Sequence, residues 1–293
     1  MTDTLATSRI GPADFRWGER TYVMGIINAT PDSFSGDGVL ADEAAPDPVA
    51  AAVAQGRRMV AEGADLLDVG GESTRPAHAP VDAAEERRRV VPVVAALRSA
   101  LPGTPISIDT TKAEVAAAAL DAGADLLNDV WGVGGDNAMA RLAAERRVPM
   151  IVMHNRTEPR YADLMAELLA DLSAALDRAR RLGNEPGQLI VDPGFGFGKT
   201  PEQNLTVLRE LGALRELGRP ILLGPSRKST LGRVLALPVD QRLEATLATT
   251  AIGIARGADI VRVHDVRENA RAARMSDAIV RGWHDDDAKE RPG

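Results

Sequence analysis

The sequence of 293 residues contains no cysteine and few aromatic residues. The absence of cysteine excludes disulfides, thiolate metal sites and cysteine nucleophiles. Aromatic residues make up only 3% of the chain, so most of its apolar side chains are aliphatic. This composition favours helices packed on aliphatic strands over an aromatic-rich β-sandwich.

Long apolar runs and an excess of positive charge are also absent. No segment approaches the roughly 20 apolar residues of a membrane span, and residues 1–20 lack the apolar core of a signal peptide. We therefore expect a soluble cytoplasmic protein with no membrane partner. The formal net charge of -7 gives no reason to expect nucleic acid as a partner, although a local cluster of Arg and Lys could still bind a small anion.

Short apolar segments alternate with helical stretches along the chain. Three joints, at 62–68, 122–128 and 256–262, share the order Gly-Ala-Asp followed by apolar residues, in which the glycine ends a helix and a strand follows. Continuously apolar strands, each followed by a helix, are typical of a parallel sheet that is covered on its outside. The predicted strands are 22–27, 66–69, 106–108, 126–127, 150–153, 189–191, 221–223 and 260–263.

Eight such units of about 30 residues fit a closed barrel better than an open sheet. The predicted fold class is therefore α/β, a single (β/α)8 TIM barrel that spans residues 21–283. Residues 1–20 are expected to form an N-terminal extension over the bottom of the barrel. Residues 284–293, which are charged and end in Pro-Gly, are expected to form a frayed tail.

The segment 194–200 (GFGFGKT) looks like a phosphate-binding loop that lacks one residue. Only three residues separate Gly194 from Gly198, whereas the loop requires four. Pro193, which would restore the count, has no N–H to donate. The nucleotide interpretation is weak, and a carboxylate at a strand end, Asp192, becomes the more informative residue because α/β enzymes place functional groups there.

Other predicted strands also end in hydrogen-bonding residues. Asp109, Asn128 and Asp192 would suit a flat heterocycle with amino, ring N–H and carbonyl groups. Any one of them could simply mark the point where a strand leaves the core. Together they are more informative, because these three groups and three cations, Arg75, Lys228 and Arg262, would converge on one barrel mouth.

A second group of strand-end residues would suit a phosphate or diphosphate. Asn28, Arg262 and His264 supply an amide, a guanidinium fork and an imidazole. A heterocycle that carries a diphosphate would engage both groups. A zinc site is a poorer alternative, because the four His residues are scattered and lack ligand spacing. A Ser-His-Asp hydrolase is poorer still, since Ser226 precedes Arg-Lys and does not lie in a nucleophile elbow.

Seven motifs occur in order between about residues 23 and 264. They are 24–35 (MGIINATPDSFS), 68–76 (DVGGESTRP), 107–110 (SIDT), 128–130 (NDV), 192–199 (DPGFGFGK), 226–228 (SRK) and 262–265 (RVHD). With these motifs the chain resembles the dihydropteroate synthases, the folate-pathway transferases that sulfonamide drugs inhibit. The resemblance implies condensation of 6-hydroxymethyl-7,8-dihydropterin diphosphate with 4-aminobenzoate, assisted by Mg²⁺, in a homodimer.

The resemblance also implies a role for individual residues. The catalytic set would be Asp109, Asp192, Lys228 and Arg262. The pterin would be held by Asp109, Asn128, Asp192 and Lys228, with Arg262 against its face. The Mg²⁺-diphosphate would be held by Asn28, Arg262 and His264, with Asn28 as the metal ligand. The aminobenzoate site would contain Thr74, Arg75, Pro76, Phe197 and Ser229, and Asp32 and Phe34 would lie on a loop that closes over it.

Two departures from the family pattern bear on selectivity. The first loop has Gly36-Asp37 where the family more often has an acidic residue directly after the serine, and Pro225 replaces a small residue. Neither removes a named polar group. The alternatives that remain are a pterin-binding paralogue without synthase activity and a methyltetrahydrofolate-dependent methyltransferase, which needs no diphosphate site.

Overall fold

The protein is a closed (β/α)8 barrel. The computed structural model describes residues 7–29, 47–72, 81–132 and 137–283. Eight parallel strands follow one another in the order β8-β7-β6-β5-β4-β3-β10-β9, and a parallel bridge between Val191 and Ile221 joins the two ends of that order. The strands are β3 (Tyr22–Asn28), β4 (Leu66–Gly70), β5 (Ile106–Asp109), β6 (Leu126–Asp129), β7 (Met150–Met153), β8 (Leu189–Asp192), β9 (Leu222–Leu223) and β10 (Ile260–Val263).

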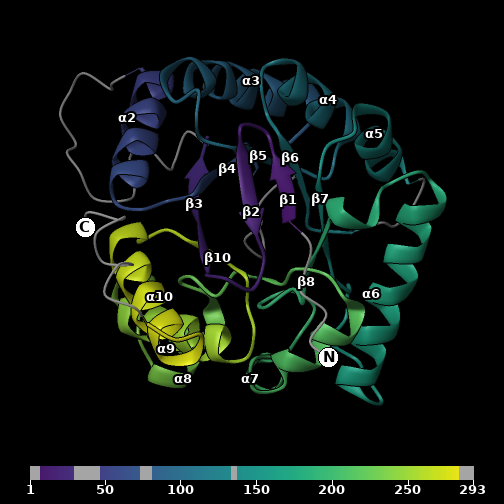
Figure 1. The fold of residues 1–293 in the computed structure, drawn as a ribbon, viewed down its shortest axis with the longest axis vertical. Coiled ribbons are helices and arrows are strands. Elements are labelled where there is room, and N and C mark those ends of the chain that lie inside the picture. The colour runs from purple at the N-terminus through teal and green to yellow at the C-terminus, as the bar shows by residue number, and fades with distance from the viewer. Residues whose placement is uncertain (1–6, 30–46, 73–80, 133–136, 284–293) are drawn as a thin grey trace.

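Helices surround this barrel on its outside (Figure 1). They are α2 (Pro48–Ala61), α3 (Ala83–Ala100), α4 (Ala113–Asp121), α5 (Ala138–Arg146), α6 (Leu164–Arg181), α7 (Pro201–Arg209), α8 (Ser229–Leu235), α9 (Leu243–Ala255) and α10 (Val266–Val280). Short 3-10 turns, η1 (Pro186–Gln188), η2 (Leu211–Leu217) and η3 (Val239–Gln241), complete the connections. The predicted fold class and all eight predicted strands are confirmed. No helix in the described part of the chain is long and apolar enough to cross a membrane.

Side chains alternate between the two sides of each strand, and this divides the core in two. One buried cluster lies between the strands and the helices and includes Leu67, Val69 and Val261. A second fills the inside of the barrel at the amino ends of the strands and includes Leu66 and Ile260. Inward positions farther along the strands are polar, because parallel barrel strands carry their functional side chains towards their carboxyl ends.

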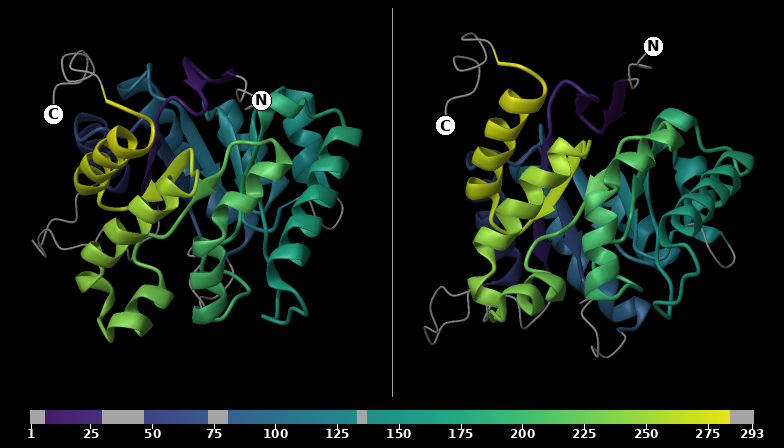
Figure 2. Two further views of the ribbon diagram at one scale, coloured as in Figure 1. Left: turned by 60° about the horizontal axis from the view of Figure 1, so that its bottom comes forward. Right: turned by 90° about the horizontal axis from the view of Figure 1, so that it is seen from below.

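A hairpin formed by β1 (Thr7–Ile10) and β2 (Ala13–Arg16) covers the amino ends of the barrel strands (Figure 2). Ile10, Phe15 and Trp17 are buried in the inner cluster, and the ring of Phe15 lies 4.5 Å from that of Tyr22 at the start of β3. The hairpin therefore closes the bottom of the barrel. Residues 1–6 and the expected tail 284–293 lie outside the described residues.

Candidate active site

Arg262 of β10 forms ion pairs with carboxylates of two other barrel strands, β4 and β5. Its Nε donates to Asp68 Oδ2 at 2.5 Å, and its Nη2 donates to Asp109 Oδ2 at 2.6 Å. Burial alone would lower the pKa of Arg262, but the two carboxylates raise it above its ordinary value. The guanidinium is thus a permanent cation with a fixed orientation.

Asp109 is a carboxyl group that can gain or lose a proton near neutral pH. Burial raises its pKa to about 7, although the charge of Arg262 acts in the opposite direction. The effect of desolvation on the pKa of Asp109 is therefore larger than that of its ion pair with Arg262. A group that titrates here can act as a hydrogen-bond donor or acceptor towards a heterocycle.

Asp68 connects two of the predicted residues, although the sequence did not indicate a role for it. Its Oδ2 accepts hydrogen bonds from Arg262 and, at 3.1 Å, from Asn128 Nδ2. Asp68 is fully buried in the middle of β4. The signal that could have found it is the inward alternation of Leu66, Asp68 and Gly70, which places a charged residue on the inside of a strand.

Asp192 lies at the end of β8, as predicted, and stays ionised over most of the neutral range. Burial raises its pKa to about 6, while the Gly194 N–H and the cations Lys228, Lys199 and Arg262 lower it. The Gly194 N–H donates to Asp192 Oδ1 at 2.7 Å. This hydrogen bond fixes one carboxylate oxygen towards the loop.

A strained turn positions Lys228. Arg227 has a positive φ of 55°, a conformation that costs a non-glycine residue about 1–2 kcal/mol. It is held by Asp265, whose carboxylate accepts from Arg227 Nη2 at 2.6 Å and from Nε at 3.1 Å. Lys228 Nζ then lies 3.8 Å from the centre of the Phe197 ring. Burial, followed by repulsion from Arg262, lowers the pKa of Lys228 to about 8.

The glycine-rich segment turns sharply after β8. Gly194, Gly196 and Gly198 all have positive φ. A Cβ at Gly194 or Gly198 would overlap the carbonyl oxygen of His154 or Arg156, so this loop packs directly on the main chain that follows β7. The glycines are required by this close approach as well as by the turn.

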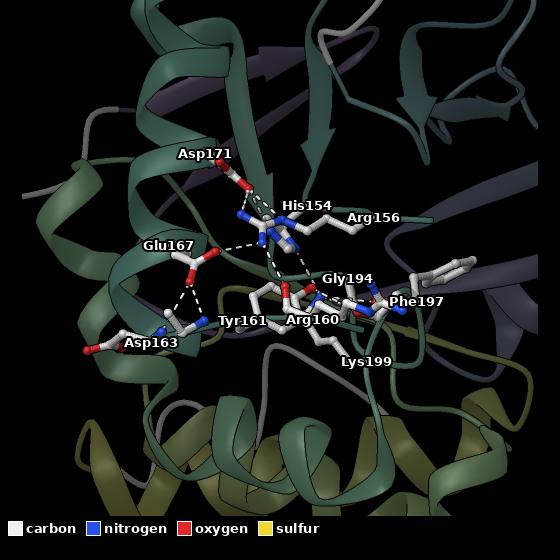
Figure 3. Close-up of polar contacts among 12 residues, drawn as sticks. His154, Arg156, Arg160, Tyr161, Asp163, Glu167, Asp171, Gly194, Phe197 and Lys199 are labelled. Carbon is white, nitrogen blue, oxygen red and sulfur yellow. Dashed lines mark hydrogen bonds and ion pairs between the residues drawn. The ribbon is translucent and has the colours of Figure 1, made fainter. Parts of the chain in front are cut away.

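The two residues that end the segment have different roles. Thr200 caps α7: its Oγ1 accepts from the Gln203 N–H, and Gln203 Oε1 accepts from the Thr200 N–H, which is a capping box. Lys199 directly precedes this N-cap. Its side chain enters the loop, where Nζ meets Gly194 O, Phe197 O and His154 Nδ1 (Figure 3).

Two of the predicted diphosphate residues, Asn28 and His264, lie at the carboxyl ends of neighbouring strands. His264 comes directly after β10, and Asn28 ends β3, the parallel neighbour of β10. Ser226 Oγ lies 2.9 Å from His264 Nδ1 and accepts from the His264 N–H at 3.1 Å, which orients the imidazole. Asn28 is partly buried at the mouth of the barrel.

Several predicted residues cannot be placed. Thr74, Arg75, Pro76, Asp32 and Phe34 lie outside the described residues, as do Gly36 and Asp37. Ser229 is exposed at the first turn of α8. Of the predicted aminobenzoate residues, Phe197 and Ser229 are therefore the two that the structure describes.

A pocket of about 210 Å³ opens beside Asp109 and Phe197. Its lining combines carboxylates with aromatic and amide groups. The lining residues are Glu72, Glu86, Asp109, Thr110, Thr111, Val130, Trp131, Asn155 and Phe197. A second hollow of about 550 Å³, around the end of α6 and Pro186, contains none of the predicted residues. The pocket at the barrel mouth is therefore the one that matches the predicted chemistry.

Comparison with known proteins agrees with this geometry. The family model described as pterin binding enzyme matches residues 24–264. The dihydropteroate synthase of Clostridium beijerinckii is 50% identical over 274 residues, which cover 93% of this chain and 99% of that protein. The chain belongs to the dihydropteroate synthase family.

Solved structures of the family have the same fold. The dihydropteroate synthase from Clostridium difficile, crystallised in the presence of pteroic acid, is 47% identical, with a TM-score of 0.85 over 91% of this chain and 99% of that chain. The Xanthomonas albilineans enzyme with 4-aminobenzoic acid is 40% identical, with a TM-score of 0.86 over 94% of this chain and 98% of that chain. The predictions of family and of transferase activity as a dihydropteroate synthase are confirmed.

Proposed function

We infer that this chain condenses 6-hydroxymethyl-7,8-dihydropterin diphosphate with 4-aminobenzoate to give 7,8-dihydropteroate and diphosphate. The observation that carries this inference is the ring of alternating charges at the barrel mouth, in which Arg262 contacts Asp68 and Asp109. The alternating donors and acceptors suit the edge of a pterin. Asp192 and Lys228 would extend the same ring.

The reaction that suits these groups needs no side-chain nucleophile. The bond between the pterin methylene and the diphosphate oxygen breaks, and the electron-rich ring stabilises the resulting carbocation. The ionised Asp192 would favour this positive charge, while Arg262 and His264 would stabilise the charge that develops on the leaving diphosphate. The aminobenzoate nitrogen then attacks the methylene and loses a proton.

Mg²⁺ would accompany the diphosphate. In the described part of the chain no three His, Cys, Asp or Glu side chains are grouped to hold a metal. Mg²⁺ commonly binds through one or two protein oxygens together with substrate phosphates, so the amide oxygen of Asn28 fits this role. When bound, the ion would neutralise charge on the leaving group.

The second substrate would bind on the Phe197 side of the site. The aromatic ring of Phe197, packed under Lys228 Nζ, would offer a face to the aminobenzoate ring. Thr74, Arg75, Pro76 and Ser229 would complete this subsite, and Asp32 and Phe34 would lie on the loop that closes over it. Sulfonamides that resemble aminobenzoate would compete there.

We propose that the protein acts in the cytoplasm as a homodimer, without nucleic acid or membrane partners. Large apolar side chains on α9 and α10, namely Ile252, Met275 and Ile279, are 48%, 62% and 70% exposed. Helices α9 and α10 pack against each other, and exposed apolar side chains that gather on one surface mark sites of protein association. Light scattering on the purified chain would measure its mass.

Two measurements test the proposed function. Calorimetric titration of diphosphate with Mg²⁺ should detect binding, and an assay with both substrates should show consumption of 4-aminobenzoate. Asp192→Asn should depress turnover far more than diphosphate binding, because it removes charge beside the cation and leaves the leaving-group residues in place. Equal losses in both would overturn the charge-stabilising role of Asp192.

The alternatives give different results in the same tests. A methyltetrahydrofolate-dependent methyltransferase would bind pterin without a diphosphate response. A paralogue without synthase activity would bind ligands and leave 4-aminobenzoate unchanged. If diphosphate neither binds nor is released, the synthase function is wrong.

A further inference from the structure

The glycine-rich loop after β8 is fastened to the segment after β7 by a polar network that contains no predicted substrate-binding side chain and reaches Phe197 through its main-chain carbonyl (Figure 3). Lys199 lies at its centre. Its Nζ is 3.0 Å from His154 Nδ1, 3.1 Å from Phe197 O and 3.2 Å from Gly194 O. An ammonium group has three N–H donors, so each donor has one acceptor.

The network fixes the proton positions on His154. Nε2 of the imidazole lies 3.2 Å from Asp171 Oδ2 and must donate to that carboxylate, which leaves Nδ1 as the acceptor for Lys199. Burial, followed by the charge of Lys199, lowers the pKa of His154 to about 4, so the ring is neutral. Arg156 Nη2 donates to the same Asp171 oxygen at 2.7 Å and holds the carboxylate in place.

The main chain reinforces the same attachment at both ends of the loop. The close packing of Gly194 on His154 O and of Gly198 on Arg156 O leaves no room for a side chain. Tyr161 Oη donates to Gly198 O at 2.8 Å. The two carbonyls that Lys199 binds, those of Gly194 and Phe197, therefore lie within a loop that is already held at its ends.

We infer that Lys199 is a positioning residue, which holds the turn from Gly194 to Phe197 so that the Phe197 ring lies against Lys228 at the barrel mouth. This inference rests on the proposed function, because Phe197 is the residue assigned to the aminobenzoate. Without the ammonium group, Phe197 O and His154 Nδ1 lose the donor that Lys199 supplies, and Gly194 O keeps only the N–H of Phe197. The turn would then sample other conformations, and Phe197 would no longer be pre-ordered for the second substrate.

Charged groups from three neighbouring parts of the barrel face Lys199. They are Asp192 from β8, Asp171 from α6 and Arg156 from the segment after β7. Burial, which outweighs the attraction of Asp192, lowers the pKa of Lys199 to about 7. The ammonium form with three donors therefore predominates below about pH 7, and the neutral amine above it has two. These charged partners lie on elements other than β3 and β10, at whose ends the predicted diphosphate residues Asn28 and His264 lie.

The test compares Lys199→Met with Arg209→Met, which removes one positive charge from an exposed position on α7. For Lys199→Met we expect the KM for 4-aminobenzoate to rise at least tenfold, while kcat and the KM for the pterin substrate change less than threefold. Amide hydrogen exchange in residues 194–198 should accelerate at least tenfold. Arg209→Met should change the KM for 4-aminobenzoate and the exchange rate of residues 194–198 by less than twofold. Thermal unfolding of both variants establishes that they fold.

Tyr161→Phe supplies a milder variant in case Lys199→Met does not fold. It removes the hydrogen bond to Gly198 O alone, and we expect a twofold to fourfold rise in the same KM with faster exchange at Gly198. An unchanged KM for 4-aminobenzoate with unchanged exchange, in a folded Lys199→Met protein, would overturn the inference. Hydrogen exchange needs no turnover, so a wild-type protein that lacks synthase activity would refute the proposed function and still allow the role of Lys199 in the loop to be measured.

Discussion

Asp68 holds two groups that would contact the pterin, Arg262 and Asn128, through a single carboxylate oxygen. Asp68→Asn keeps the size of the side chain but removes the charge that balances Arg262. Hydrogen bonds to charged groups contribute about 1.5–3 kcal/mol, so we predict that kcat/KM for the pterin substrate falls roughly tenfold to a hundredfold. Steady-state kinetics at saturating 4-aminobenzoate measure this effect.

Ser107 provides the matched control. It is the Cα partner of Asp68 on β5, is buried, and its Oγ has no hydrogen-bond partner in the described structure. Ser107→Ala should leave kcat/KM within about twofold, because no hydrogen bond is lost. If both variants lose activity equally, any substitution at these two paired positions inside the barrel impairs the enzyme, and the specific role of Asp68 is refuted.

Asp192 and Lys228, whose pKa values lie below and above the value of about 7 for Asp109, set the two outer limbs of the predicted pH dependence. Below pH about 6 the carboxylate of Asp192, whose pKa burial raises to about 6, gains a proton and can no longer stabilise a cation. Above pH about 8 the ammonium of Lys228, whose pKa burial lowers to about 8, loses its proton. The value of kcat/KM should therefore fall on both sides of a maximum between these values. A profile that stays flat from pH 7 to pH 5 would contradict the assignment of Asp192.

The strand-end residues could be predicted from the sequence because each follows an apolar segment. Asp109, Asn128, Asp192 and Arg262 all lie at the barrel mouth as expected. Asp68 could not be found in this way, since it lies inside a strand and its role depends on a contact with Arg262, 194 residues away in the sequence. Local patterns carry no information on such pairings until the strand order and register are known.

At the scale of elements, the glycine-rich loop is shaped by contact with the neighbouring loop as well as by turn geometry. Gly198 and Gly218 have similar φ values of 54° and 61°, but a Cβ at Gly198 would overlap Arg156 whereas one at Gly218 would meet nothing within 4 Å. Gly218→Ala should therefore cost only the strain of positive φ, about 1–2 kcal/mol. Gly198→Ala should cost about 1–3 kcal/mol more, because the loops must separate.

Urea denaturation of both alanine variants measures this difference directly. The loop contact also predicts that Gly198→Ala raises the KM for 4-aminobenzoate, since Phe197 immediately precedes the altered residue, and that Gly218→Ala does not. Equal losses of stability in the two variants would show that the loops can move apart at no cost.

The elements themselves were predictable to different degrees. Strands β3, β4, β5, β6 and β8 extend one or two residues beyond the apolar segments that predicted them, whereas β7 matches its predicted bounds. Except for Gly70 of β4, the added residues are polar, because positions near the barrel mouth accept polar side chains. Strand β9 is shorter than expected, with Ile221 joined only by an isolated bridge. The hairpin of β1 and β2 was expected only as an extension, since its pairing with itself depends on burial of Phe15 and Trp17 against the barrel.

At the scale of the whole molecule, stability and chemistry lie at opposite ends of the strands. The amino ends are closed by an apolar cluster that joins the hairpin to the inside of the barrel. The carboxyl ends carry the buried charges of Asp68, Asp109 and Arg262, which burial makes costly. The apolar end can therefore offset the instability that the charged end introduces, and the two should respond independently to mutation.

Phe15→Ala tests this separation. Phe15 is 1% exposed, and its ring lies 5.4 Å from that of Trp17 and 4.5 Å from that of Tyr22. Its truncation should lower the free energy of unfolding by about 3–5 kcal/mol, while the KM for both substrates stays within twofold because no residue of the barrel mouth moves. Asp14→Ala in the same strand, whose ion pair with Arg9 is exposed, should change stability by less than about 1 kcal/mol. Urea denaturation and steady-state kinetics on both variants measure the two quantities, and a large change in KM for a Phe15→Ala protein that remains folded would show that the bottom of the barrel controls the geometry of its mouth.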